Sequence, residues 1–366
     1  MKLKKTSAML TAAVMLCGVT ACSTSTASSG TSSGTSGSSG STNGGTPISP
    51  GVLRGPDGVS SYDTVSHAPE DTGRTYNIGI AKLMDHPALN LSQEGFVAAL
   101  TDSGFVIGDN LNIDYRDGQG DDAELSAIAN DFVTNNYDLI FAIATPAAQA
   151  CANATSDIPI IATAITDFVD AGLVESNSRP NTNVSGTTDM SPIEEQIDLM
   201  REIFPDVGTV GFFYTATESN SVLQVGIARE YAQSLGLETV EMTVNNAGEI
   251  RNALLQLVEQ CDAIYVPTDN MLAAQIPAVA SVCNPAQIPV FCAEGGMVES
   301  GGFGTLSIDY YDLGYQAGLM AIRVIDGASI DRMSIQKSTV FEYSFNAAAI
   351  QAIGITLPIR YQSYII

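Results

Sequence analysis

Short apolar runs alternate with longer amphipathic segments along the chain from Tyr76 onward. The short runs predict β-strands, and the longer segments, in which apolar residues recur every three or four positions, predict α-helices. The runs IFAIA, IPIIATAI and AIYVP are continuously apolar, which is typical of strands buried on both faces of a parallel sheet. Strand and helix in alternation therefore predict an α/β fold made of βαβ units.

The expected elements form two successive series, separated by a pause near Gly186. Strands are expected at 76–83, 111–116, 137–144, 158–165, 184–189, 207–214, 237–244, 261–267, 288–293, 301–309 and 339–346. Helices are expected at 92–104, 122–136, 146–155, 191–205, 220–236, 247–260, 271–283 and 310–327. The roughly 290 residues after Arg74 exceed what one hydrophobic core usually organises. We therefore expect two doubly wound parallel-sheet lobes, joined by a hinge and facing one cleft.

The residues before Arg74 follow a different pattern. The start MKLKK is basic, and the apolar segment 8–19 is shorter than the about 20 residues that span a bilayer. A secretory signal peptide over residues 1–21 is therefore expected. Val19-Thr20-Ala21-Cys22 is similar to the lipobox of bacterial lipoproteins, in which the Cys is lipidated after cleavage; an ordinary signal peptide with an incidental Cys is the alternative. Residues 22–73, rich in Ser, Thr and Gly, are expected to form a flexible tether.

The charge of the chain excludes some partners. The formal net charge is −25, and removal of Lys2, Lys4 and Lys5 with the signal peptide would make it −28. A chain this acidic is a poor candidate for binding nucleic acid, and anionic lipid headgroups would repel it. The expected lipid anchor, rather than surface charge, would therefore hold the protein at a membrane.

Residues suited to catalysis or metal binding are scarce. The sequence has no nucleophile elbow, phosphate-binding loop or dinucleotide fingerprint, and His86 is the only His after the tether. Four Cys follow the tether, none in a CxxC pair, so no zinc site is expected. These Cys are expected as buried thiols, while a disulfide between Cys283 and Cys292 stays open. We expect neither an enzyme nor a cofactor.

Polar side chains gather directly after the expected strands, where ligands bind in sheets of this kind. The candidate ligand-binding residues are Asp85, His86, Thr145, Ala147, Ala148, Thr166, Asp167, Tyr214, Ser219, Asn220, Ser221, Asp269, Asn270, Glu294 and Asp309.

Two groups within this set have complementary chemistry. Thr145, with Pro146 behind it, would cap a helix whose free N–H groups receive a carboxylate, and Thr166 would add a hydroxyl. Asp269 and Glu294 would receive an ammonium from the other side of the cleft. The combination fits an α-amino acid; the alternative is that these residues only cap helices and form turns.

Several segments resemble the substrate-binding lipoproteins of ATP-binding-cassette (ABC) importers, in particular their tryptophan/tyrosine-type family. They are IGIAKLMDHPALNLSQEGFVAAL, IATPAAQA, AITDFVDAGLV, GTTDM, ESNS, YVPTDNM and GTLSIDYYDLGYQAG. The resemblance spans about 76–358 and implies a type I periplasmic-binding-protein fold with three hinge crossings. It implies a first lobe of 74–187 plus 301–327 and a second of 188–300 plus 328–366, with crossings near Gly186, Gly301 and Gly327.

The resemblance also implies a function. A monomeric receptor, held outside the cytoplasm by its lipid anchor, would capture a small solute between its lobes and deliver it to an ABC permease. An aromatic amino acid is the favoured solute. The alternative is a sensor that presents its closed form to a signalling partner in the membrane.

Overall fold

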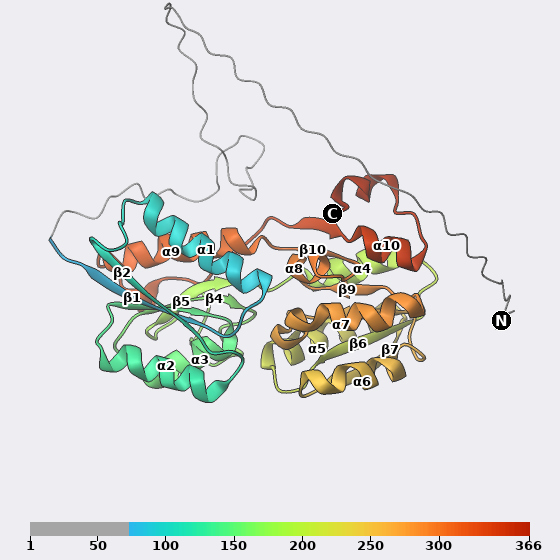
Figure 1. Ribbon diagram of the computed structural model, residues 1–366, viewed down its shortest axis with the longest axis horizontal. Helices are drawn as coiled ribbons and strands as arrows, with labels where there is room; N and C mark the ends of the chain where they lie inside the picture. Colours follow the sequence, from blue (N-terminus) through green and yellow to red (C-terminus); the bar gives the residue numbers. More distant parts are fainter. Residues whose placement is uncertain (1–72) are drawn as a thin grey trace, which may run out of the picture. The chain divides into compact units, whose positions relative to one another are not determined.

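The computed structural model of the protein describes residues 73–366 (Figure 1). The expected signal peptide, the expected lipidation site Cys22 and most of the expected tether lie outside the described residues. Within the described part, no helix is both long and apolar enough to cross a membrane. Two six-stranded sheets, each with helices packed on it, organise this part of the chain, and we call each sheet with its helices a lobe.

The sheet of the first lobe is parallel throughout, in the order β11-β5-β4-β3-β1-β2. Its strands are β1 (Tyr76–Lys82), β2 (Leu111–Asp117), β3 (Leu139–Ile143), β4 (Ile160–Ile165), β5 (Val184–Thr188) and β11 (Gln336–Lys337). Its helices are α1 (Pro87–Asp102), α2 (Asp122–Thr134), α3 (Thr145–Ala154), α9 (Tyr310–Ile325) and the 3-10 turn η2 (Ile330–Arg332).

The sheet of the second lobe has the order β12-β10-β9-β8-β6-β7, and only β12 runs antiparallel to its neighbour. Its strands are β6 (Thr209–Thr215), β7 (Glu238–Val244), β8 (Ala263–Val266), β9 (Val290–Cys292), β10 (Gly304–Ser307) and β12 (Glu342–Phe345). Its helices are α4 (Ile193–Ile203), α5 (Ser219–Ser234), α6 (Ile250–Leu257), α7 (Asn270–Ala286), α8 (Gly295–Glu299) and α10 (Ala347–Ile353), with 3-10 turns η1 (Ala247–Glu249) and η3 (Ile359–Tyr364).

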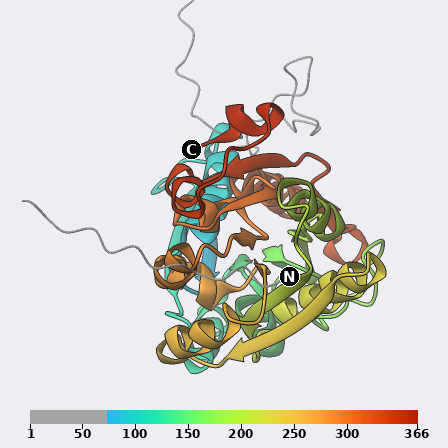
Figure 2. The ribbon, with the colours of Figure 1, turned by 90° about the vertical axis from the view of Figure 1, so that its right-hand side faces the viewer.

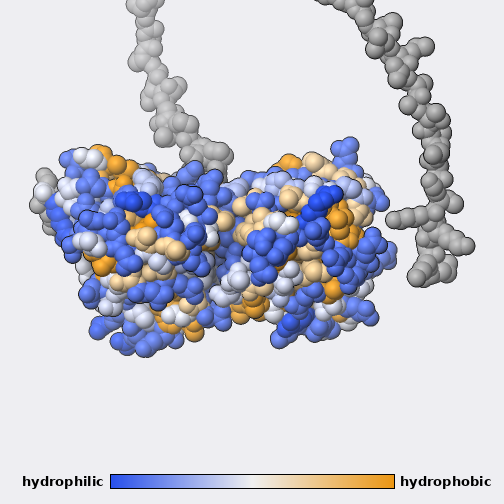
Figure 3. Space-filling model, turned by 60° about the horizontal axis from the view of Figure 1, so that its bottom comes forward, coloured by the Kyte–Doolittle hydropathy of each residue, from blue (hydrophilic) through white to orange (hydrophobic). Residues whose placement is uncertain are grey.

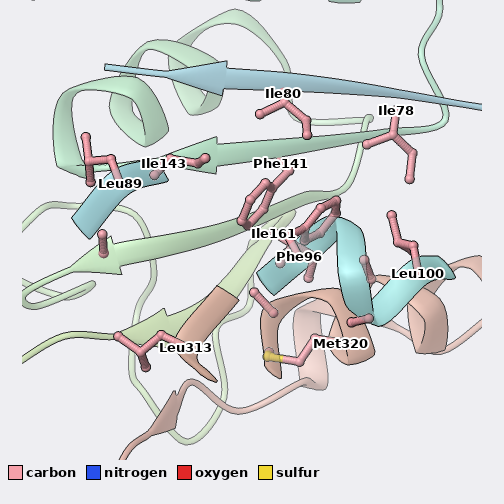
Figure 4. Packing of buried hydrophobic residues seen from close by; sticks show 14 of the residues in the cluster. Ile78, Ile80, Leu89, Phe96, Leu100, Phe141, Ile143, Ile161, Leu313 and Met320 are labelled. Atoms are coloured by element: carbon pink, nitrogen blue, oxygen red, sulfur yellow. The ribbon is translucent and has the colours of Figure 1, made fainter. Parts of the chain in front are cut away.

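The two lobes confirm the expected α/β fold of two doubly wound sheets. Strands β3 and β4 are buried over their whole length, as their continuous apolar runs predict. In the first lobe one core cluster lies between the sheet and the pair α1 and α9 (Figure 4), and a second lies between the sheet and the pair α2 and α3. Phe96 of α1 stacks on Phe141 of β3 with ring centroids 3.7 Å apart, and both rings are fully buried. Burying such aromatic side chains supplies much of the hydrophobic stabilisation of this lobe.

Helices α1 and α9 lie side by side with their backbones in close contact (Figure 1). A Cβ atom on Gly314 of α9 would lie 1.9 Å from the carbonyl oxygen of Ser92, and one on Gly95 of α1 would lie 2.0 Å from that of Tyr311. Only glycine fits at these two positions. The Ser92 hydroxyl also donates to the carbonyl oxygen of Tyr310 at 3.1 Å, which fixes the first turn of α9 against α1.

The chain first passes between the lobes near Gly186, as expected, but the other two crossings differ from the expected ones. Residues 301–327 are expected in the first lobe, yet β10 pairs with β9 and β12 in the second. Residues from 328 onward are expected in the second lobe, yet β11 pairs with β5 in the first. The crossings therefore lie just after β5, between β10 and α9, and between β11 and β12. Gly301 and Gly327 instead form turns within one lobe each.

Two further differences concern individual elements, whereas the C-terminal segment lies on the second lobe as expected. Helix α1 begins at Pro87 rather than at residue 92, because Pro suits the first helical position. The short elements α8, β11 and α10 are not among those expected from the pattern. The C-terminal segment, red in Figure 2, packs on the second lobe, where Phe345 pairs with Ile365.

The hydrophilic surface (Figure 3) and the buried, unpaired cysteines are as expected from the sequence. The face in Figure 3 is mainly hydrophilic, with hydrophobic residues in small separate patches. Cys151, Cys261, Cys283 and Cys292 are all buried and free, so the structure favours buried thiols over the Cys283–Cys292 disulfide. Burial raises the pKa of the Cys151 thiol to about 12, which makes it unreactive.

Candidate functional site

Residues after the strands of both lobes enclose a narrow cavity of about 20 Å³, the inner cavity. A larger space of about 430 Å³, the outer groove, lies beside it and is also lined by both lobes. Asn220 and Asn270 line both spaces. The carboxyl ends of the strands therefore meet at one cleft, as expected for sheets of this type.

Hydrogen bonds across the inner cavity join the two lobes. The Thr166 hydroxyl of the first lobe lies 3.2 Å from the Thr268 hydroxyl of the second. The Gln224 amide donates to both of them, at 3.1 and 2.6 Å. We call these three residues the polar bridge. All three are buried, so each of these bonds is shielded from competing water.

Asp189 lies just after β5, where the chain crosses between the lobes, and it accepts a hydrogen bond from the polar bridge. Its carboxylate accepts from Thr166 at 3.2 Å and from the Tyr310 hydroxyl at 2.7 Å. Burial raises the pKa of Asp189, while these two hydrogen bonds work in the opposite direction. Asp189 thus lines the cavity, but both of its carboxylate oxygens accept hydrogen bonds from neighbouring side chains.

Asp269 has a similar structural role in the second lobe. Its carboxylate accepts from the Thr215 N–H at 2.6 Å, the Thr215 hydroxyl at 2.8 Å and the Leu272 N–H at 2.9 Å. The residue therefore caps α7 and ties it to the end of β6. These contacts match the capping alternative rather than the ammonium role expected from the sequence.

Glu294 differs from both of these carboxylates. Its side chain is 2% exposed, and neither carboxylate oxygen has a hydrogen-bond partner among the described residues. Burial, and then the nearby charge of Asp189, raises the pKa of Glu294 to about 8, while the backbone N–H of Met297, too poorly placed for a hydrogen bond, works weakly in the opposite direction. Unpaired buried carboxyl oxygens are costly, so this position indicates a donor supplied from outside the chain.

His86 and Asn270 bring the two lobes together beside Glu294 in the same cavity. The His86 ring nitrogen Nε2 lies 3.3 Å from the Asn270 Oδ1 oxygen. The amide nitrogen of Asn270 donates to the Glu218 carboxylate at 2.7 Å. Burial lowers the pKa of His86 to about 4, so its imidazole is neutral at pH 7. Burial and the charge of Asp269 raise the pKa of Glu218 to about 7.

Several residues that line the inner cavity have unpartnered side-chain atoms that can accept a hydrogen bond. Besides the two Glu294 oxygens they are Oδ1 of Asn220 and Nδ1 of His86. The Asn220 amide nitrogen already donates to the Thr268 carbonyl at 2.7 Å, which leaves its oxygen as an acceptor. Neither Lys nor Arg is among the described residues that line this cavity. The cavity is therefore suited to a ligand group that is positively charged and rich in hydrogen-bond donors.

The outer groove is polar, and the first turn of α3, the position expected to bind a ligand carboxylate, lines it. Thr145 and Pro146 of α3 line it, facing Ser219, Glu218 and Asn220 of the second lobe. Thr145 is the first residue of α3 and Ala144 is the N-cap, so the expected capping by Thr145 is wrong. The first turn of α3 and Glu294 therefore lie in adjacent spaces rather than in one.

The structure divides the residues expected from the sequence into three groups. The inner cavity is lined by His86, Thr166, Asn220, Asp269, Asn270 and Glu294. The outer groove is lined by Thr145 and Ser219, together with Asn220 and Asn270. Neither space is lined by Asp85, Ala147, Ala148, Asp167, Tyr214, Ser221 or Asp309.

The residues outside both spaces have other contacts. Asp85 is exposed and lies 3.5 Å from Lys82, and Tyr214 donates to Glu241 at 2.8 Å. Asp167 caps the turn at Val169 and Asp309 caps α9. Ala147, Ala148 and Ser221 are completely buried in the lobes.

Several cavity residues are missing from the sequence-based set. Asp189 directly follows β5, and Thr268 and Tyr310 come two and three residues after β8 and β10; this position could have identified them. Leu89 and Met297 add apolar surface, and no sequence signal distinguishes them from core residues. Within residues 73–366, no group of three or more His, Cys, Asp or Glu is arranged to hold a metal ion.

Two α/β lobes that enclose a small polar cavity between them are typical of a class of solute-binding proteins. The family described as ABC transporter substrate binding protein matches residues 77–362. The chain belongs to this family, whose members bind solutes for ABC transporters outside the cytoplasm and are not enzymes. More distant solute-binding proteins share the type I periplasmic-binding-protein fold alone.

Three known proteins illustrate this similarity. A tyrosine-binding protein of Clostridioides difficile (strain R20291) is 40% identical over 283 residues, which cover 77% of this chain and 82% of that protein. The domain from Streptococcus pneumonia solved in complex with L-Trp is 32% identical, with a TM-score of 0.77, over 80% of this chain and all of the other. A substrate-binding protein with adhesive properties from Clostridium difficile, solved in a ligand-free, open structure, is 38% identical, with a TM-score of 0.65, over 80% of this chain and 99% of the other.

Proposed function

We propose that this substrate-binding protein captures an aromatic amino acid between its lobes and delivers it to the permease of an ABC importer. The observation that carries the proposal is Glu294, a buried carboxyl with two unpartnered oxygens in a cavity lined by no Lys or Arg of the described chain. An α-ammonium group supplies both the charge and the donors that this position needs. The tyrosine-binding relative and the L-Trp complex favour an aromatic side chain.

Capture requires the lobes to separate and close again. The inner cavity of about 20 Å³ has room for about one water molecule, whereas ligand pockets usually measure about 300–1,000 Å³. Opening would break the contacts of the polar bridge and the His86–Asn270 contact. Closure around the solute would then bring Glu294 of the second lobe to the ammonium, with Leu89, Ala164 and Met297 as apolar lining for the ring.

The first turn of α3 remains our proposed receiver for the ligand carboxylate. Thr145 lines the same groove as Asn220 and Asn270, which also line the inner cavity. A ligand whose ammonium lies at Glu294 can therefore direct its carboxylate toward the groove. The N-terminus of α3 would stabilise the negative charge through its free N–H groups and the helix dipole.

We also propose that Cys22 carries a lipid anchor. The support is the order of basic start, short apolar segment and Val19-Thr20-Ala21 before Cys22. The Ser/Thr/Gly-rich stretch after Cys22 would keep the lobes close to the membrane and raise their effective concentration at the permease.

Native mass spectrometry and titration calorimetry test the proposed solute. Protein purified from its host is expected to carry a small molecule with the mass of tyrosine or tryptophan. Glu294→Gln is expected to lose affinity for that amino acid, while Glu299→Gln, an exposed site on the same short helix, is expected to keep it. A copurified solute without an ammonium group, or unchanged affinity in a folded Glu294→Gln, would contradict the proposal.

A further inference from the structure

A chain of three side chains fixes the orientation of His86. Glu218 accepts the amide nitrogen of Asn270 at 2.7 Å and its backbone N–H at 3.0 Å. Rotating the Asn270 amide by half a turn would place its oxygen against the Glu218 carboxylate. The amide oxygen must therefore point to His86, where it lies 3.3 Å from Nε2. An amide oxygen only accepts hydrogen bonds, so His86 Nε2 carries the proton.

The other ring nitrogen of His86 is consequently a bare acceptor. A neutral imidazole that carries its proton on Nε2 has a lone pair on Nδ1. Nδ1 is buried, and among the described residues it has no partner. His86 is the N-cap residue of α1, yet its side chain makes no capping hydrogen bond. The ring is therefore not needed to begin the helix, and it lines the inner cavity.

The acceptors of the inner cavity outnumber the donors of an ammonium group. When a bound ammonium ionises Glu294, the unpartnered acceptor atoms are the two Glu294 oxygens, Asn220 Oδ1 and His86 Nδ1, whereas an ammonium has three N–H groups. Glu294 and Asn220 suffice for these three donors. The fourth acceptor, His86, requires a donor from another part of the solute.

We infer that His86 is a specificity-determining residue, which accepts a hydrogen bond from the side chain of the bound amino acid. The inference rests on the proposed function and narrows its substrate class. The site selects aromatic amino acids whose ring carries a donor, a phenol O–H or an indole N–H. Phenylalanine has the ring without the donor, so it would leave Nδ1 unpaired in the closed cavity.

Titration calorimetry with L-tyrosine, L-tryptophan and L-phenylalanine tests this selection. The wild-type protein is expected to bind phenylalanine about 10- to 100-fold more weakly than the better of the other two, since an unpaired buried acceptor has a cost of that order. In His86→Leu this ratio should fall to about one, because the variant has no acceptor to leave unpaired. Glu94→Gln, on the exposed face of α1, should keep the wild-type ratio.

Nitrogen NMR gives a second readout that does not depend on the His86→Leu variant. The chain has two His, His67 and His86, so His67→Asn leaves a single imidazole to assign. We expect the neutral Nε2–H tautomer, and a shift of the Nδ1 resonance when tyrosine or tryptophan binds but not when phenylalanine binds.

The outcomes separate this inference from the proposed function. If none of the three amino acids binds the wild-type protein, both are wrong. If phenylalanine binds as tightly as tyrosine and tryptophan, or if the NMR spectrum shows a protonated Nδ1, the role of His86 is wrong and the proposed function stands. A ratio in His86→Leu that equals the wild-type ratio would also refute the role of His86.

Discussion

Replacing Glu294 by Gln is expected to have two opposite effects, higher stability without solute and weaker solute binding. Gln keeps the shape of the side chain and removes its ionisation. The buried position has no compensating cation among the described residues that line the cavity, so ionisation there is unfavourable until an ammonium arrives. A site held ready for a charged ligand commonly reduces stability in this way.

The magnitude of the stability effect follows from the pKa of Glu294. The pKa rises from 4.5 to about 8 in the folded protein, so folding takes up a proton between these pH values. The contribution of Glu294 is therefore fully present below about pH 4.5 and is lost as the pH rises through about 8. At about 1.4 kcal/mol for each pH unit, the loss is at most about 5 kcal/mol, and opening of the cleft reduces it.

Thermal melts without solute at pH 5 and pH 8.5 measure this effect. The melting temperature of Glu294→Gln should exceed that of the wild-type protein by more at pH 8.5 than at pH 5. Glu299→Gln serves as the control, because this exposed carboxyl at the other end of α8 contributes least to the raised pKa of Glu294 and should show a much smaller difference. A melting difference that is the same at both pH values would show that Glu294 is not a buried, unpaired carboxyl.

Calorimetry on the same variants measures the binding effect. Loss of one partner from a desolvated charge pair costs about 2–5 kcal/mol, so affinity for the amino acid should fall by roughly 30-fold to several thousand-fold. Because the ammonium favours the ionised carboxyl, wild-type affinity should rise between pH 6 and pH 8, and that of Glu294→Gln should not. Unchanged affinity would refute the proposed contact even if the melting data agreed with it.

Three further predictions concern other parts of the chain. Asp269→Asn should lower the free energy of unfolding by about 1–3 kcal/mol, because it weakens the hydrogen bonds to Thr215 and Leu272. The same variant should weaken solute binding less than Glu294→Gln does. A larger loss of affinity would show that Asp269 binds the ligand ammonium. Gly314→Ala should lower the free energy of unfolding by about 1–3 kcal/mol in chemical denaturation, since its Cβ would lie 1.9 Å from the Ser92 carbonyl oxygen, whereas Gly226→Ala, with open space around it, should not. Cys22→Ala should release the protein from the membrane fraction of cells, and a variant that stays there would contradict lipidation at Cys22.

The sequence predicts the local elements of this fold well, because apolar runs such as β3 and β4 need no information from distant residues. The lobe boundaries were harder to predict. Strand β10 belongs to the second lobe because β12 pairs with it from a segment more than thirty residues later, at Gly304 with Phe345. Nothing in the run GGFGTLSID specifies that partner.

The candidate site shows a similar limit. Position after a strand identified His86, Asn270 and Glu294, which line the cavity, but the same rule also selected the exposed Asp85. Whether a carboxylate is free depends on its partners in space. Asp269 is bonded to Thr215, 54 positions earlier in the chain, whereas Glu294 has no such partner among the described residues.

The close contact of α1 with α9 also has a consequence for the order of events during capture. His86 stands directly before α1 and Tyr310 is the first residue of α9, and both line the inner cavity. Because the two helix backbones are in close contact at Gly95 and Gly314, we expect the starts of α1 and α9 to keep their spacing when the lobes turn. We expect the first lobe to act as a preassembled template on which an incoming solute aligns its ring, before the second lobe arrives with Glu294.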